Sequence, residues 1–181
     1  MCNKRTARGL TLIELLVFIV IVGIAATAML AVMGNLTRQS ASLLPEQQAR
    51  AVAAGLLDEI LAQPYTFCDP DAPNAATATN SGGCGGPTED SLAPEPGETR
   101  GGATPFDNVN DYNGYVGTVS FPDNSAAAGL PGYTVRVQVQ SAGVIGAVPG
   151  GETLRVIVTV SGPAGQLARQ GGVRIRHAPN T

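Results

Sequence analysis

Few residues in this chain of 181 have side chains suited to nucleophilic, redox or transition-metal chemistry. There are three cysteines, Cys2, Cys68 and Cys84, and one histidine, His177. A structural zinc site needs four ligands, and a Cys–His enzyme needs a reduced cysteine beside its histidine. The sequence has no Gly-x-Ser-x-Gly, and its glycine cluster at 81–86 lacks the Lys-Ser or Lys-Thr pair of a phosphate-binding loop. We therefore predict no enzyme, no catalytic residue and no cofactor.

One segment, residues 107–114, is rich in the oxygen ligands that calcium prefers. Aligned to the helix-loop-helix calcium pattern, it fails at the first and twelfth positions, which hold Val109 and Ser120. Turns in which Asp and Asn side chains bond their own backbone are the preferred interpretation. Asp107 and Asp111 remain candidates for a calcium site of another geometry.

The first structural element that the sequence predicts is a long apolar segment near the N-terminus. Leu15–Met33 contains 19 residues without a charge, enough for a helix of about 28 Å, close to the hydrocarbon thickness of a bilayer. Lys4, Arg5 and Arg8 precede it with no acid among them, so we expect the N-terminus to stay cytoplasmic. A cleavable signal peptide fits less well, because the apolar segment is too long and a glutamate, Glu14, stands directly at its start.

Gly9-Leu10-Thr11-Leu12-Ile13-Glu14, between a short basic leader and an apolar helix, resembles the type IV prepilin motif. The resemblance implies that a prepilin peptidase cuts between Gly9 and Leu10 and methylates the new amine of Leu10. It also implies that Glu14 neutralises the amine of a neighbouring subunit during filament assembly. The sequence departs from the usual pattern at Leu10, where phenylalanine is most common. The expected partners are other pilin subunits, the peptidase and, before assembly, inner-membrane lipid.

Beyond the membrane segment, residues 35–64 are expected to form an amphipathic helix that Pro64 ends. Its apolar residues recur every three or four positions, from Ala49 to Leu61. Pro45 suggests that the helix restarts there instead of continuing smoothly.

Residues 66–132 hold 11 Gly, eight Pro and nine acids, with Arg100 as the single base, which is typical of loops. Cys2 would leave with the leader, and the two remaining cysteines are expected on the oxidising, exported side. We therefore predict a Cys68–Cys84 disulfide that braces this loop.

The C-terminal part is expected to form an antiparallel sheet. Apolar and polar residues alternate over 133–140 and 154–160, with a less regular strand at Val116, Val119 and Phe121 and a short last strand at Val173 and Ile175. Glycine pairs at 150–151 and 171–172 are expected to be turns. The prediction is an α+β, pilin-like fold with five parts: a leader (1–9), a transmembrane or filament-core helix (10–34), an amphipathic helix of the head (35–64), a loop region (65–132) and a sheet (133–181).

The helix end at 57–61, the cysteine pair around a glycine-rich loop and the 106–114 segment look similar to minor pilins of the mannose-sensitive haemagglutinin (MSHA) type of pilus. This implies a low-copy subunit for filament biogenesis and surface adhesion, in the inner membrane with a periplasmic head and later on the cell surface. The alternatives are a type II secretion pseudopilin and a glycan-binding adhesin head that would use Tyr112, Tyr115 or Tyr133. The net charge of −3, which becomes −6 without the leader's three bases, argues against nucleic acid as a partner.

Overall fold

The computed structural model describes residues 11–127, 129–163 and 165–176, with the backbone alone for 37–42. The chain forms two compact units, residues 1–44 and residues 45–181, and the second is called the head below. One helix, α1 (Leu12–Ala62), contributes to both units. Pro45 lies inside α1, so the expected restart of the helix is wrong. Proline removes one backbone donor there, but its fixed φ remains compatible with a helix.

In the head, α1 presents the expected apolar stripe to the core. The side chains of Ala49, Ala53 and Ile60 are fully buried, and those of Leu56 and Leu57 nearly so. They form one cluster with the inner face of the sheet. Most of the stability of a helix in a protein comes from this kind of packing.

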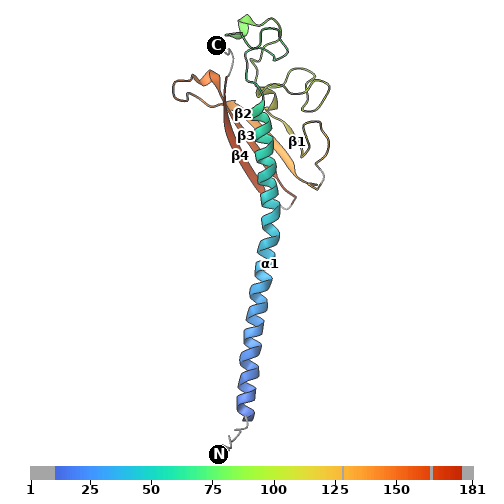
Figure 1. Cartoon of the computed structure of the whole chain (residues 1–181), viewed down its shortest axis with the longest axis vertical. Coiled ribbons are helices and arrows are strands. Elements are labelled where there is room, and N and C mark those ends of the chain that lie inside the picture. The colour runs from blue at the N-terminus through green and yellow to red at the C-terminus, as the bar shows by residue number, and fades with distance from the viewer. Residues whose placement is uncertain (1–10, 128, 164, 177–181) are drawn as a thin grey trace, which may run out of the picture. The chain divides into compact units, whose positions relative to one another are not determined.

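Among the described residues the sheet has four antiparallel strands in the order β1-β2-β3-β4. These strands and α1 are labelled in Figure 1. The strands are β1 (Val116–Thr118), β2 (Thr134–Ser141), β3 (Thr153–Ser161) and β4 (Leu167–Ile175). Along β2 and β3 every second residue is buried, and Val137 pairs with Val158 and Val139 with Val156. The α+β prediction is therefore confirmed, as is the alternation in β2 and β3.

Two predictions about the strands are corrected. β1 ends at Thr118, so Val119 and Phe121 lie outside it. β4 is longer than expected, because Gly171 and Gly172 lie inside it, opposite Ile157 and Val156, and form no turn. A Cβ on Gly172 would come within 2.6 Å of Leu61 Cδ1. The missing side chain is what lets α1 approach the sheet closely.

The first part of the loop region has a small core of its own, and its later part contributes Phe106, Val109 and Tyr112 to the main core. The predicted disulfide between Cys68 and Cys84 is present, with a Cα–Cα distance of 5.5 Å. Cys68 is buried with Ala72, Ala75 and Ala78 in a second small cluster. Three short 3-10 turns complete the head: η1 (Ser81–Gly83), η2 (Asn110–Tyr112) and η3 (Gly150–Glu152).

Candidate functional site

The residues predicted to be processed, Gly9 and Leu10, lie outside the described residues. The described chain begins at Thr11, whose carbonyl accepts the backbone N–H groups of Glu14 and Leu15 at 3.1 and 3.2 Å. Glu14 therefore lies in the first turn of α1, where a carboxylate interacts favourably with the helix dipole. No ion pair between described residues involves Glu14.

The helix surface that follows Glu14 is apolar on all sides. Leu12–Leu36, 25 residues with a mean hydropathy of 2.9, is long and apolar enough to cross a membrane, and none of its most apolar window is buried. The hydroxyl of Thr27 donates to the carbonyls of Gly23 and Ile24 at 3.1 and 2.9 Å. A polar group satisfied within its own helix is compatible with lipid or with an apolar filament core.

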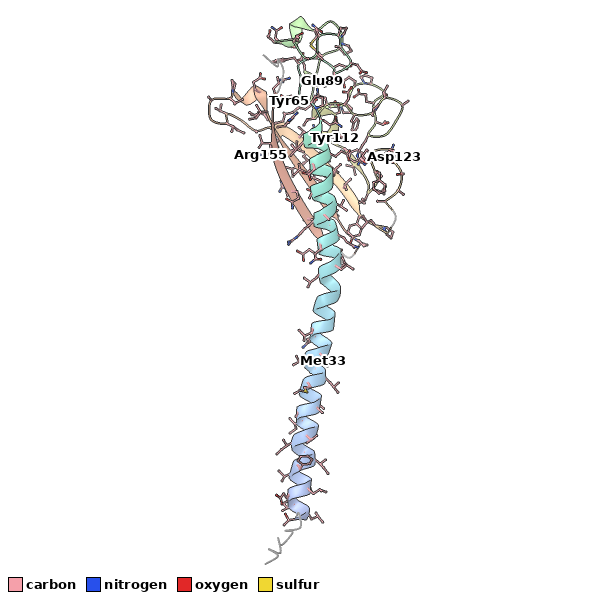
Figure 2. The ribbon with its side chains drawn as sticks, in the orientation of Figure 1. Met33, Tyr65, Glu89, Tyr112, Asp123 and Arg155 are labelled. Atoms are coloured by element: carbon pink, nitrogen blue, oxygen red, sulfur yellow. A yellow bond between two sulfur atoms is a disulfide. The ribbon has the colours of Figure 1, made fainter. Side chains whose placement is uncertain are left out.

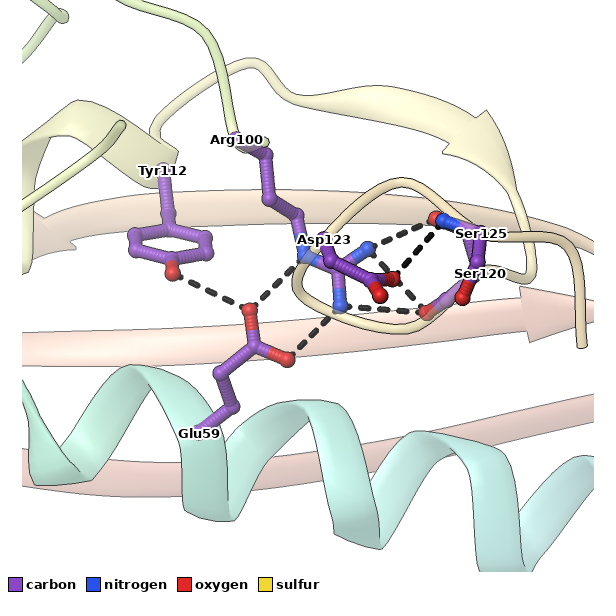
Figure 3. A network of polar contacts seen from close by, with 6 residues as sticks. All are labelled: Glu59, Arg100, Tyr112, Ser120, Asp123 and Ser125. Carbon is purple, nitrogen blue, oxygen red and sulfur yellow. Dashed lines mark hydrogen bonds and ion pairs between the residues drawn. The ribbon is translucent and has the colours of Figure 1, made fainter. Parts of the chain in front are cut away.

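A buried ion pair links α1 to the loop region (Figure 3). The Arg100 guanidinium donates to both carboxylate oxygens of Glu59, each at 2.7 Å, and to the backbone carbonyl and the hydroxyl of Ser120. The Tyr112 hydroxyl donates to Glu59 Oε1 at 3.1 Å. The side chains of Arg100 and Glu59 are 5% and 17% exposed. Burial, together with the Glu59 carboxylate, raises the pKa of Tyr112 above its ordinary value.

The sequence pattern does not predict this ion pair, because Glu59 lies outside the apolar stripe from Ala49 to Leu61 and its partner is far away in the chain. The available signal was Arg100 itself, the single base among nine acids in residues 66–132. A lone base in so acidic a loop indicates a specific carboxylate partner. The pair joins residues that are 41 positions apart.

An apolar cleft of about 630 Å³ lies next to this ion pair. Its lining combines one face of α1 in the head with the segment that follows β1, including Val52, Leu56, Phe121 and Leu130. Glu59 and Arg100 belong to the same lining. The cleft offers apolar contact and no cluster of groups suited to catalysis.

The structure assigns the two candidate calcium residues to different groups. Asp69, Asp71 and Asp107 form one acidic group, and Glu89, Glu95 and Asp111 form another. Asp111 Oδ2 accepts the backbone N–H groups of Asp107 and Asn108, which precede it in its own segment, so this oxygen is satisfied locally. Burial raises the pKa of Asp107 to about 6 and that of Asp111 to about 7.

The tyrosines considered for sugar stacking are largely inaccessible. Tyr112 and Tyr133 are 2% and 4% exposed, and the Tyr133 hydroxyl lies 2.9 Å from Gln48 Oε1. Tyr115 is half-buried, and its ring packs edge-on against Phe106, with the ring centroids 6.2 Å apart. These rings contribute to the core of the head.

Comparison with known proteins identifies one feature of the chain. Residues 4–30 match the family described as the prokaryotic N-terminal methylation motif. No curated protein and no solved structure gives a significant match. The matched residues include Lys4, Arg5 and Arg8, Glu14 and most of the apolar helix segment. The motif indicates a type IV pilin-like or pseudopilin protein, a structural class of protein.

Proposed function

We propose that the chain is a minor type IV pilin that is processed between Gly9 and Leu10 and joins a filament through the N-terminal part of α1. This proposal rests on two features that occur together in one segment, the methylation motif and an apolar helix. The methylation motif at 4–30 overlaps a helix that is apolar on every side over Leu12–Leu36. The head adds an α+β fold in which the rest of α1 packs on an antiparallel sheet.

Glu14 is the residue that gives the helix an assembly role. It is the single charged residue between Leu12 and Leu36, so it carries a high desolvation cost in lipid or in a filament core. Cleavage after Gly9 would create a cationic amine at Leu10, four residues before Glu14 in the sequence. The amine of a neighbouring subunit would then neutralise Glu14, because opposite charges attract strongly where the dielectric constant is low.

The processing step is tested by replacing Gly9. Gly9→Ala, or a larger residue there, is expected to block cleavage, so that the leader remains on the protein and the Leu10 amine stays unformed. Gly23→Ala is the matched control, because a Cβ at Gly23 would meet nothing within 4 Å. Intact-mass spectrometry of the membrane-extracted proteins reads the N-terminus. A Gly9→Ala chain that begins with methylated Leu10, as the wild type should, would contradict the proposal.

The assembly step is tested by replacing Glu14. We expect Glu14→Ala to be cleaved normally but to be depleted from sheared filaments, because the neighbouring amine loses its counter-charge. Glu46→Ala is the control, since Glu46 is another glutamate of α1 and makes a largely exposed ion pair with Arg50. Immunoblots of the membrane and filament fractions measure the distribution of each protein. Equal incorporation of both variants would exclude this role for Glu14.

We further propose that this pilin is of the MSHA type and supports pilus biogenesis and surface adhesion. This assignment rests on the resemblance of the helix end, the cysteine-bracketed loop and the 106–114 segment to the minor pilin MshD. A type II secretion pseudopilin is the alternative, because the methylation motif indicates either class. Deleting the gene separates them: a pilin mutant should lose surface filaments and attachment but secrete normally. A secretion defect with normal filaments would favour the pseudopilin.

The location follows from the same proposal. Before assembly, the helix over Leu12–Leu36 would cross the inner membrane with the leader in the cytoplasm and the head in the periplasm, and afterwards the subunit would be part of a surface filament. Alkaline phosphatase fused after residue 176 should be active, since that enzyme folds in the periplasm. A glycan-binding head is less supported, because Tyr112 and Tyr133 are buried. Glycan binding by the isolated head would favour that alternative.

A further inference from the structure

The loop region contains a group of buried carboxylates whose oxygens converge. Glu89, Glu95 and Asp111 each offer one carboxylate oxygen, and these oxygens lie within 4.8 Å of one another. Glu89 is 4% exposed and Asp111 is 1% exposed, while Glu95 is half-buried. Glu89 lies among the loops of the head (Figure 2).

The hydrogen bonds of Glu89 and Asp111 use one carboxylate oxygen of each residue and leave the other oxygen without a partner. Asn110 Nδ2 donates to Glu89 Oε2 at 2.5 Å, and Asp111 Oδ2 accepts two backbone N–H groups. Glu89 Oε1, Glu95 Oε2 and Asp111 Oδ1 are buried with no hydrogen-bond partner. Buried polar atoms are nearly always satisfied, so three unpartnered oxygens in one group of acids indicate a missing ligand.

No basic side chain neutralises this group among the residues that the structure describes. The three ion pairs there are Arg50–Glu46, Arg100–Glu59 and Arg176–Glu152, and none includes Glu89, Glu95 or Asp111. Burial and the neighbouring carboxylates raise the pKa of Glu89 to about 9. This is the direction expected when acids are crowded together without a cation.

We propose that Glu89, Glu95 and Asp111 bind a calcium ion that links the 89–95 segment to the turn η2. Oxygens that surround a calcium ion at 2.3–2.6 Å are at most roughly 5 Å apart, and the three carboxylates satisfy this limit. The side-chain oxygen Oδ1 of Asn110 is also buried without a hydrogen-bond partner, and the amide nitrogen of the same side chain donates to Glu89. The group offers oxygen alone, which favours a hard cation over zinc or copper.

Calcium fits this group better than magnesium does. Magnesium requires a nearly ideal octahedron and retains several waters, whereas calcium accepts irregular sets of carboxylate oxygens. Here the ligands come from irregular loop segments and one short 3-10 turn. These segments already meet through two further bonds, from Asn110 Nδ2 to the Ser91 carbonyl and from Asn113 Nδ2 to the Leu92 carbonyl. A bound ion would add to the contacts that these two amide side chains already make between the two segments.

The other acidic group, Asp69, Asp71 and Asp107, is outside this proposal. Asp71 is exposed and the other two residues are half-buried, so solvent reaches the group. Of these three residues, only Asp107 has a buried oxygen without a partner.

The test is an isothermal calorimetry experiment in which calcium is titrated into the full-length chain in a detergent solution initially free of calcium. We expect one ion per chain and a dissociation constant of about 10⁻⁵ to 10⁻³ M, with clearly weaker binding of magnesium. Glu89→Gln and Asp111→Asn should each weaken calcium binding about tenfold or more. Asp90→Asn is the matched control, because Asp90 is the exposed neighbour of Glu89 and should leave the affinity unchanged.

Thermal unfolding provides a second measurement, which distinguishes a variant that fails to bind calcium from one that fails to fold. Calcium should raise the midpoint of the wild type, and EDTA should reverse the effect. In EDTA, Glu89→Gln should be at least as stable as the wild type, because glutamine can be buried there without the proton uptake that the Glu89 carboxyl requires. Glu95→Gln, at a half-buried position, provides a second binding variant. Wild-type affinity in Glu89→Gln or Glu95→Gln, or no heat and no midpoint shift at millimolar calcium, would overturn the proposal. Equal binding of magnesium would overturn the assignment to calcium.

Discussion

Removing one partner of the Arg100–Glu59 ion pair should destabilise the head far more than removing both. In Arg100→Met, the Glu59 carboxylate stays buried at 17% exposure and keeps only the hydroxyl of Tyr112 as a donor. The two hydrogen bonds of 2.7 Å that hold it are lost. Stranding a buried charge in this way costs about 3–5 kcal/mol, a large part of the stability of an ordinary domain.

The double variant Arg100→Met/Glu59→Met removes the charge together with its partner. The remaining loss comes from the Ser120 and Tyr112 groups that the pair had satisfied, at about 1 kcal/mol each. Apolar packing by the two methionines offsets part of it. We therefore expect the double variant to be more stable than Arg100→Met alone by about 2 kcal/mol.

These differences in the free energy of unfolding are measured by urea unfolding of the head fragment, residues 45–181, monitored by far-UV circular dichroism. That fragment forms a compact unit with its own core. Arg50→Met is the control on the same helix: its partner Glu46 is largely exposed, so the cost should stay near about 0.5 kcal/mol. A double variant as unstable as the sum of its two single variants would refute the reasoning, as would a cost below about 1 kcal/mol for Arg100→Met.

Three further predictions concern the packing, the disulfide and the pH dependence of the head. Gly172→Val should destabilise it by about 1–3 kcal/mol in the same urea assay, because the added atoms overlap Leu61; an unchanged midpoint would contradict the close approach of α1 to β4. Cys68→Ser opens a loop with a sequence separation of 16 and should cost about 3 kcal/mol, with faster proteolysis between residues 69 and 105; equal proteolysis would show that the bond is dispensable. In EDTA, stability should fall as the pH rises from about 5 to 9. Burial raises the pKa of Glu89 to about 9, so the folded state keeps a proton that the unfolded state releases near the ordinary value of 4.5. The same pH dependence in Glu89→Gln would assign the effect to other groups.

Periodicity predicted the parts of the fold that depend on neighbouring residues. The stripe from Ala49 to Leu61 and the alternation in β2 and β3 are both visible in the sequence, because one buried face imposes a fixed spacing. Gly171 and Gly172 were misinterpreted, since a glycine pair has the same composition in a turn and at a close helix–sheet contact. In β4 it is Val173 and Ile175 that are exposed, each at 45%, so the apolar residues there did not mark the inner face.

The contacts of the loop region could not be predicted, because they join residues far apart in the chain. Glu59 and Arg100 are 41 positions apart, and Asn110 and Glu89 are 21 apart. Composition predicted a loop and the cysteines predicted its brace. Neither feature indicates which acids meet, because that depends on how an irregular backbone closes on the core. Asp111 lies in the acidic run at 107–114, yet the two acids whose oxygens lie near its own, Glu89 and Glu95, belong to the 89–95 segment.

The end of β4 also determines the order in which the head can become fully packed. Arg176 lies over the rings of Tyr65 and Phe67, 3.9 and 4.0 Å from their centroids, and donates to the Thr66 carbonyl. It thus covers the first residues of the loop region from the far end of the sheet, 110 positions away. The loop cannot acquire this cover until the last strand has paired with β3. Tyr65 and Phe67 therefore stay uncovered by Arg176 until β4 has joined the sheet, so this segment remains open to chaperones and proteases until a late step of folding.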